Sequence, residues 1–283
     1  MLTSLKTLTI FLTVMICAAA ASAQERVSLR PVFIAGQESR YAIAATVETA
    51  VTPSGVDGLA ANFRRELTTT LTVRTVKLGD TGEIHQEATL EAITFNSNSD
   101  EDKASKVEVA GKKIQFTTNS AGQLLRCVIP NSPGYQAAAE LLFSMAGWYP
   151  SGEVMVGGLW AAVGQGPVYT ERLSEISKGA TTAYKLASLS KGIASIEGAV
   201  TLNQKGVSVL NAGRALDIGV IASGNGTARF DYDVSSGRLV GCVTESRFEG
   251  IVSHTQPTAA GEKLHPREGS LVETAKFSIK LIQ

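Results

Sequence analysis

Two short segments of this 283-residue chain carry the same residues at the same offsets, and this repeat constrains the fold more than any other feature. The segments span residues 121–129 and 236–244. The matching residues are Gly122, Leu124, Cys127 and Val128 in the first segment and Gly237, Leu239, Cys242 and Val243 in the second. A constant shift between matching residues indicates an internal duplication, which describes architecture more directly than chemistry.

Alternation of apolar and polar residues predicts that both copies belong to antiparallel strands. In 83–95, Ile84 and Leu90 share one face while His85 and Glu87 share the other, which is typical of a strand with one wet face. The predicted strands are 66–76, 83–95, 113–118 and 123–129 in the first half, 183–189, 193–202, 227–234 and 238–251 in the second half, and 275–281 at the end. Each half is therefore predicted to be a β-meander.

One apolar segment lies outside the repeats and predicts a helix over about 133–147. Ser132 is suited to the N-cap, Pro133 to the first helical position and Gly147 to the stop. A helix that is apolar on nearly every side should be buried broadly. The predicted class is therefore mainly β (α+β): two tandem antiparallel β-meander repeats form a strongly curved sheet or half-barrel, and the helix packs against its concave face.

The same signals divide the chain into six parts. They are a cleaved signal peptide at 1–23, the first β-meander repeat at 24–133, a connecting apolar helix at 134–150, the second repeat at 151–252, a polar loop at 253–270 and a C-terminal strand at 271–283.

The N-terminus predicts export to the periplasm or the extracellular space. Lys6 precedes an apolar run, and Ala21-Ser22-Ala23 forms a small-x-small cleavage site. The alternative is an N-terminal membrane anchor, but the run is short for a bilayer span. Cleavage removes Lys6 and leaves 25 basic against 26 acidic side chains. We therefore expect no nucleic-acid partner, and because no later apolar run is long enough, no integral membrane segment.

The two cysteines of the mature chain, Cys127 and Cys242, fall at inward positions of alternating strands. In an exported protein they either form one disulfide between the repeats or remain two buried free thiols.

Nothing in the sequence makes a strong case for an enzyme, a metal site or a cofactor. The histidines, His85, His254 and His265, have no acidic or cysteine partner at metal-ligand spacing. Asp231 and Asp233 share one face of a predicted strand, where two carboxylates can act as a general-acid pair or hold calcium, but an exposed acidic face is the commoner outcome. We therefore predict a non-catalytic protein.

Aromatic residues gather at the helix exit and in the following strand, where they either pack the junction between the repeats or line the mouth of a cavity between helix and sheet. The residues predicted to line such a cavity are Leu141, Leu142, Met145, Trp148, Tyr149 and Trp160.

Three short motifs give the chain a family resemblance. Leu29-Arg30-Pro31, then Gly36 and Tyr41, and later Val156 to Trp160 resemble a family of bacterial exported proteins that has no assigned function. A curved sheet that clasps an apolar helix is also remotely similar to periplasmic lipoprotein-carrier and lipid-carrier half-barrels. That resemblance implies acyl chains held against the concave sheet.

Two function classes follow. The first is an exported binding module that holds a lipid or other hydrophobic molecule between helix and sheet. The second is a structural, envelope-associated interaction protein with a filled core and no ligand. An enzyme acting through Asp231 and Asp233 ranks third.

Overall fold

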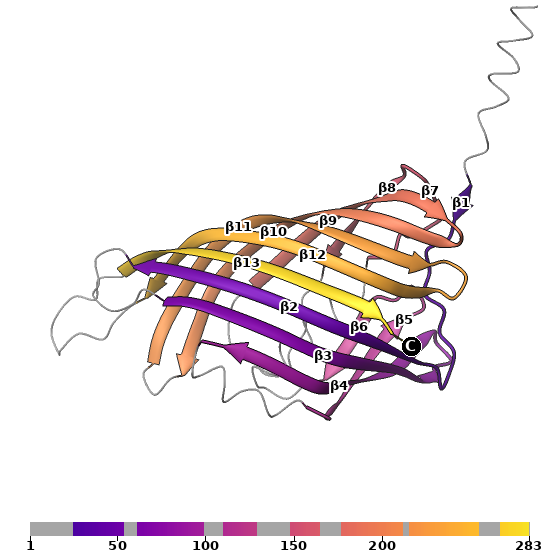
Figure 1. Cartoon of the computed structure of the whole chain (residues 1–283), viewed down its shortest axis with the longest axis horizontal. Helices are drawn as coiled ribbons and strands as arrows, with labels where there is room; N and C mark the ends of the chain where they lie inside the picture. The colour runs from indigo at the N-terminus through magenta and orange to yellow at the C-terminus, as the bar shows by residue number, and fades with distance from the viewer. Residues whose placement is uncertain are drawn as a thin grey trace, which may run out of the picture.

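Every regular element among the described residues of this computed structural model is a β-strand (Figure 1). The structure describes residues 25–53, 61–98, 110–128, 148–164, 177–211, 215–254 and 267–282. The strands are β1 (Arg26–Val27), β2 (Glu38–Pro53), β3 (Ala61–Leu78), β4 (Glu83–Ser97), β5 (Lys113–Asn119), β6 (Leu124–Val128), β7 (Val154–Met155), β8 (Leu159–Gly164), β9 (Ser177–Ser190), β10 (Ile193–Asn211), β11 (Ala215–Asp233), β12 (Arg238–His254) and β13 (Arg267–Leu281).

Eleven of these strands form one antiparallel sheet in the order β6-β5-β4-β3-β2-β13-β12-β11-β10-β9-β8, while β1 pairs with β7 in a two-stranded sheet. β2 lies beside β13, from Tyr41 opposite Leu281 to Pro53 opposite Gly269 (Figure 1). Strands near the two ends of the chain therefore join the halves of the sheet. The described sheet is not closed, because β6 and β8 lie at its two edges.

The duplicated segments have the same backbone irregularity. In the β5–β6 hairpin Phe116 lies opposite Cys127, and the register then shifts so that Thr118 pairs with Leu124 and Leu125 is left over. In the β11–β12 hairpin the corresponding residues are Phe230 opposite Cys242, Tyr232 opposite Leu239, and Val240 left over. A bulge of this kind bends its strand and is a specific feature of a fold. Its repetition at equivalent positions extends the sequence duplication to the backbone.

The turns of these two hairpins are also alike. Asn119 Oδ1 accepts hydrogen bonds from the backbone N–H groups of Ala121 and Gln123. Asp233 Oδ1 accepts two backbone N–H bonds as well, from Ser235 at the same offset and from Ser236, which is three residues away where Gln123 is four. The glycine that follows in each turn has positive φ, 75° at position 122 and 64° at position 237, which L side chains adopt only under strain.

One hydrophobic core receives residues from both halves of the sheet. Leu71 and Ile114 come from the first half, Leu186 and Ile196 come from the second, and all four side chains are at most 2% exposed. Because residues so far apart in strand order share one core, the sheet must curve around it (Figure 1). Trp148, 1% exposed, packs into the same core from outside the sheet.

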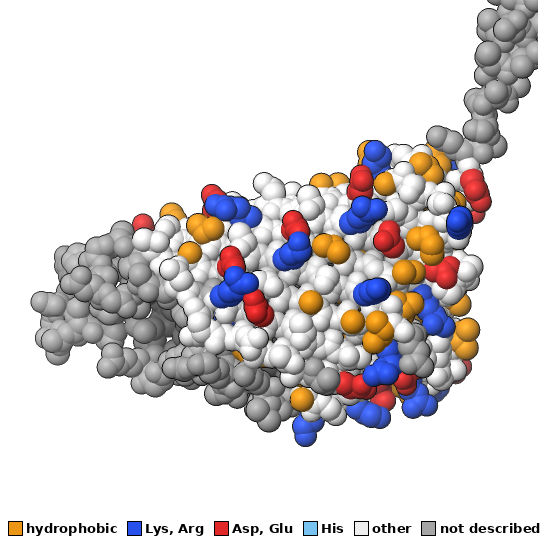
Figure 2. Space-filling view, viewed as in Figure 1, with side chains coloured by type: hydrophobic (Ala, Val, Ile, Leu, Met, Phe, Trp, Pro, Cys, Tyr) orange, Lys and Arg blue, Asp and Glu red, His pale blue; other side chains and the backbone are white. Residues whose placement is uncertain are grey.

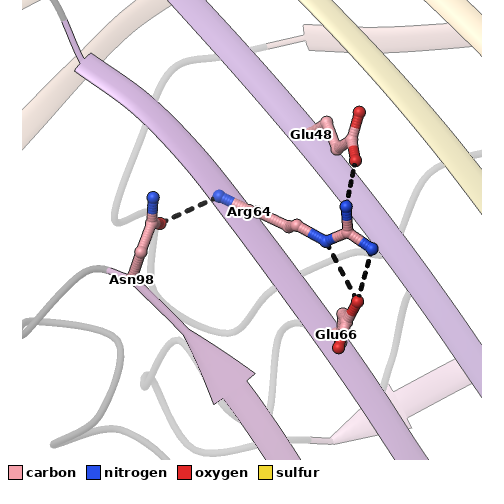
Figure 3. Close-up of polar contacts among 4 residues, drawn as sticks. All are labelled: Glu48, Arg64, Glu66 and Asn98. Carbon is pink, nitrogen blue, oxygen red and sulfur yellow. Dashed lines mark hydrogen bonds and ion pairs between the residues drawn. The ribbon is translucent and has the colours of Figure 1, made fainter.

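The outer face of the sheet carries charged side chains. Figure 2 shows acidic and basic residues side by side across this face. Arg64 on β3 contacts Glu48 at 2.9 Å and Glu66 at 2.7 Å, and its backbone N–H donates to Asn98 Oδ1 (Figure 3). Lys276 contacts Glu245 at 2.6 Å between β13 and β12. Exposed pairs of this kind add little stability, but they show which face is suited to water.

The predicted α+β class, with a helix against the concave face, is wrong. The described residues form an all-β fold without a helix, and residues 133–147 lie outside them. Residues outside the sheet pack into its core: Leu29 is fully buried, and Trp148 stacks on the ring of Phe230 with centroids 5.1 Å apart. An apolar run alone does not distinguish a buried helix from other buried segments, so the sequence could not establish a helix packed against the sheet.

Seven of the nine predicted strands lie within β3, β4, β5, β9, β10, β12 and β13. The predicted strand 227–234 extends one residue beyond β11, and the predicted strand 123–129 extends one residue beyond β6 at each end. A two-residue turn at Lys191 and Gly192 joins β9 to β10, and both residues have positive φ, as type I′ hairpin turns require. β2 and β8 were not predicted, and β10 and β11 are longer than expected. Within the described ranges, no helix is long and apolar enough to cross a membrane.

Candidate functional site

A cavity of about 120 Å³ lies at the end of the sheet where the two repeated turns approach each other. Gly122 of the first turn and Gly237 of the second both line it. Residues 29–33, which we call the strap, cross this end of the molecule, and Pro31, Val32 and Phe33 of the strap also contribute to the lining. The cavity is therefore bordered by both repeats together with a segment that belongs to neither repeat.

One side of the cavity is polar. Four adjacent strands, β2, β3, β4 and β5, each contribute one side chain, and we call the set Ser39, Thr75, Gln86 and Thr118 the polar band. Thr118 Oγ1 donates a hydrogen bond to Gln86 Oε1 at 3.1 Å. Thr75, Gln86 and Thr118 are 5%, 9% and 3% exposed, and they are three of the five buried polar side chains among the described residues. Buried polar groups are costly unless they find partners, so their convergence on one cavity is notable.

The rest of the lining is aromatic and aliphatic. Tyr41 and Val73 lie beside the polar band on β2 and β3, Phe116 lies on β5, and Tyr149 and Leu239 complete the wall. Burial raises the pKa of Tyr41, and it raises the pKa of Tyr149 well above its usual value. Both phenol groups therefore stay protonated and neutral at physiological pH. A largely apolar cavity with a few converging polar groups is the usual form of a small-molecule site.

The strap is fixed by hydrogen bonds to the second repeat. The Tyr232 hydroxyl donates to the backbone oxygen of Arg30 at 2.6 Å, and the backbone N–H of Val32 donates to the oxygen of Gly237 at 3.4 Å. Burial raises the pKa of Tyr232, so this hydroxyl remains a donor. Gly237 is also required sterically, because a Cβ there would lie 2.5 Å from the Val32 nitrogen.

A charged side chain outside the lining, that of Arg238, contacts the lining residue Gln37. With the Gln37 amide oriented to satisfy both its groups, the Gln37 side-chain oxygen accepts from Arg238 Nε at 2.9 Å. None of the described residues that line the cavity is acidic or basic.

The residues predicted to line a cavity are only partly brought together. Leu141, Leu142 and Met145 lie outside the described residues. Tyr149 lines the cavity, Trp148 stacks behind it with ring centroids 4.2 Å apart, and Trp160 donates from Nε1 to the backbone oxygen of Trp148 at 2.7 Å. Trp148 Nε1 itself is buried and has no hydrogen-bond partner among the described residues.

Cys127 and Cys242 are free, buried thiols, so the structure contains the second of the two predicted alternatives. Burial raises the pKa of Cys127 to about 11 and that of Cys242 to about 12. Each thiol therefore stays protonated and packs as a small apolar group opposite a phenylalanine.

The two aspartates of β11 are bound to neighbouring groups. Asp231 accepts from the Ser195 hydroxyl at 3.1 Å, and Asp233 accepts from the Ser235 hydroxyl at 2.6 Å. That hydroxyl, with further bonds from Ser236, lowers the pKa of Asp233 to about 2. Asp233 thus stabilises a turn. His85 is half-buried on β4, and no group of three metal-ligating side chains occurs within the described ranges.

Sequence reasoning missed the polar band, although a signal for it exists. In β4 the inward positions read Ile84, Gln86, Ala88 and Leu90, so Gln86 interrupts an apolar series. Thr75 follows Val73 in the same way on β3, and Thr118 follows Phe116 on β5. Each break is weak alone, and only the pairing of the strands brings the three together.

No family model matches this chain, and no curated protein matches it. Among solved structures the chain has a weak resemblance to a bacterial porin. A triple mutant of the Rhodopseudomonas blastica porin aligns with 86% of this chain and 100% of its own at 10% identity and a TM-score of 0.24. Another mutant of that porin aligns with 87% of this chain and 100% of its own, at 10% identity and a TM-score of 0.22. Likeness at this level carries no argument about function. The resemblance to lipoprotein and lipid carriers is not confirmed.

Proposed function

We propose that the protein is an exported, non-catalytic binding protein that holds a small, partly hydrophobic molecule in the end cavity. The observation that carries this proposal is the convergence of Thr75, Gln86 and Thr118 on a cavity whose other walls are aromatic and aliphatic. A cavity that served only to pack the core would be expected to be apolar or filled. Export rests on the N-terminal signal pattern of the sequence.

The size of the cavity limits the ligand. An engineered protein cavity of about 150 Å³ accommodates benzene, so about 120 Å³ suits a ring-sized molecule or the terminal part of a longer one. A whole acyl chain does not fit this space. The binding module expected from the sequence is therefore proposed here for a small molecule and not for a complete lipid.

The lining supports a binding role without catalysis. None of the described lining residues is an Asp, Glu, His, Lys, Arg or Cys, the side chains that supply most general acids, general bases and activated nucleophiles. The hydroxyl of Thr118 is engaged with an amide and not with a base. These groups can orient a ligand but have no described means of activating one.

The test uses mature protein purified from its export compartment without detergent. Native and denaturing mass spectrometry should differ by the mass of one small molecule. The matched control is Thr118→Tyr, which places in the cavity the side chain that the second repeat carries at the equivalent position, Tyr232. We expect this variant to fold and to lose the additional mass. Wild-type protein without any additional mass, and without uptake of any added small molecule, would contradict the proposal.

A second candidate function is an interaction protein, which the two edges of the sheet that are unpaired among the described residues favour. Leu125 on edge strand β6 is 51% exposed and Leu159 on edge strand β8 is 75% exposed. An open edge can add a strand from a partner protein. Empty wild-type protein that co-purifies with a stoichiometric partner, and loses it on Leu159→Lys, would favour this function over ligand binding.

A further inference from the structure

The end cavity has distinct polar and apolar sides, and this division indicates what kind of molecule it selects. The polar band lies across the ends of β2 to β5, while Tyr41, Val73 and Phe116 lie one inward position further along three of those strands. A ligand that fills the space must place an apolar surface against Tyr41, Val73 and Phe116 and a polar edge against the polar band. A ligand that is apolar all round would leave the remaining hydrogen-bonding capacity of the polar band unused, at a cost.

The hydrogen bond between Thr118 and Gln86 determines what the polar edge can offer. Thr118 uses its proton on Gln86 Oε1, so the Thr118 oxygen retains its capacity to accept. Gln86 uses its oxygen in the same bond, so its amide N–H₂ retains its capacity to donate. The pair therefore presents one acceptor and one donor next to each other. A hydroxyl group is itself a donor and an acceptor, and it can satisfy both at once.

Charge restricts the ligand further. The described lining contains neutral side chains only, and the phenols of Tyr41 and Tyr149 stay protonated because burial raises their pKa values. The guanidinium of Arg238 contacts the oxygen of Gln37. Moving a carboxylate or an ammonium group into such surroundings is strongly unfavourable. The cavity is therefore suited to an uncharged ligand.

From the volume of the cavity, its separate polar and apolar sides and its uncharged lining, we infer that it binds a small neutral ring that carries a hydroxyl group, such as a phenol or a cyclic alcohol. The ring packs against Tyr41, Val73 and Phe116, and the hydroxyl donates to Thr118 Oγ1 and accepts from the amide of Gln86. This inference rests on the proposed binding function and names the class of molecule that the site recognises.

The test is fluorine NMR of the mature protein at pH 7 with four probes of similar size: 4-fluorophenol, fluorobenzene, 4-fluorobenzoate and 4-fluorobenzylamine. We expect 4-fluorophenol to bind with a Kd of about millimolar or tighter, as its few heavy atoms allow. Fluorobenzene should bind roughly five- to tenfold more weakly, because it satisfies neither group of the pair. The two charged probes should bind on the order of a hundredfold more weakly or not at all.

Two near-isosteric variants separate recognition from folding. Thr118→Val removes the acceptor, and we expect it to weaken 4-fluorophenol about five- to tenfold while fluorobenzene binds as well as before or better. The control is Thr69→Val. Thr69 is 6% exposed on β3 but lies outside the lining, and its hydroxyl donates to the backbone oxygen of Glu91 at 2.7 Å. This control should leave the affinity of all four probes unchanged, and thermal unfolding shows whether each variant folds.

The outcomes distinguish this inference from the function on which it rests. If fluorobenzene or a charged probe binds as tightly as 4-fluorophenol, the hydroxyl selection is wrong although a binding protein remains. Binding of 4-fluorophenol that persists in Thr118→Tyr places the site elsewhere and overturns the inference. If no probe binds and the protein also purifies without a ligand, the cavity holds water only, and both proposals fail.

Discussion

The contact between the strap and the second repeated turn predicts that two glycines with similar backbone angles differ in how well they tolerate alanine. Gly237 has φ of 64°, and an alanine Cβ there would lie 2.5 Å from the backbone nitrogen of Val32. Gly192, in the β9–β10 turn, has φ of 80°, and a Cβ there would meet nothing within 4 Å. Gly192→Ala is therefore a matched control that introduces backbone strain without a collision.

The expected losses in the free energy of unfolding follow from the backbone strain and from the collision with Val32. A non-glycine residue in the left-handed region costs about 1–2 kcal/mol, which is the whole expected effect of Gly192→Ala. Gly237→Ala adds overpacking against backbone that no side-chain rotation can relieve, which costs about 1–3 kcal/mol more. We therefore expect Gly237→Ala to lower the free energy of unfolding by about 2–5 kcal/mol in total.

The assay is urea unfolding of the mature protein, followed by tryptophan fluorescence because Trp148 lies in the core. Both variants should shift the midpoint with an unchanged m-value, since neither alters the surface that unfolding exposes. Equal destabilisation by the two substitutions would refute the reasoning, because it would mean that Val32 does not rest on the turn at Gly237 and that the strap does not enclose the cavity there.

Three further predictions concern the core, the thiols and the turn. Trp148→Ala should lower the free energy of unfolding by about 3–5 kcal/mol, measured by urea unfolding, and a loss below about 1 kcal/mol would contradict its place in the core. Native protein at pH 8 should not react with a thiol reagent, because burial raises the pKa of Cys127 to about 11 and that of Cys242 to about 12. Unreduced protein in denaturant should show two reactive thiols, because both cysteines are free. Denatured protein with no reactive thiol would mean that the two cysteines form a disulfide. The pKa of Asp233 falls to about 2 on folding, so its ionisation stabilises the fold above its unfolded pKa of about 4, and this contribution is lost as pH falls through about 2. Asp233→Asn should keep the turn, as Asn119 does in the first repeat, and urea midpoints at pH 7 and pH 2.5 should show a smaller loss on acidification than in wild type; an equal loss would contradict this role.

Sequence reasoning located strands where apolar and polar residues alternate regularly, and turns where the backbone requires glycine. It failed where glycines within a strand allow the sheet to bend. Residues 223–226, Ser-Gly-Asn-Gly, suggest a turn, yet they lie in the middle of β11. A Cβ on Gly226 would lie 2.6 Å from the backbone oxygen of Glu245, and one on Gly224 would collide with the backbone of Arg247. These glycines allow neighbouring strands of a strongly bent sheet to approach, which local sequence alone does not distinguish from a turn.

The site was less predictable because it depends on contacts between distant segments. Tyr149 was predicted from its aromatic character to line a cavity between helix and sheet, and it lines the end cavity instead. The polar band requires the pairing of β2, β3, β4 and β5, and Arg30 of the strap lies 202 residues from the Tyr232 hydroxyl that it accepts from. The pairing of β2 with β13 is equally non-local. Alternation predicts which residues point inward, but not which inward residues meet.

The duplication explains how two similar hairpins produce one cavity. Thr118 and Tyr232 occupy equivalent positions, each next to the shared bulge and opposite a leucine of the neighbouring strand. In the second repeat the long phenol reaches the strap and donates to the oxygen of Arg30. In the first repeat the short threonine leaves space and offers its hydroxyl to Gln86. Divergence at this one position therefore assigns fixation of the strap to one copy and the ligand space to the other. Tyr232→Thr should accordingly loosen the strap without closing the cavity, whereas Thr118→Tyr closes the cavity and leaves the strap in place.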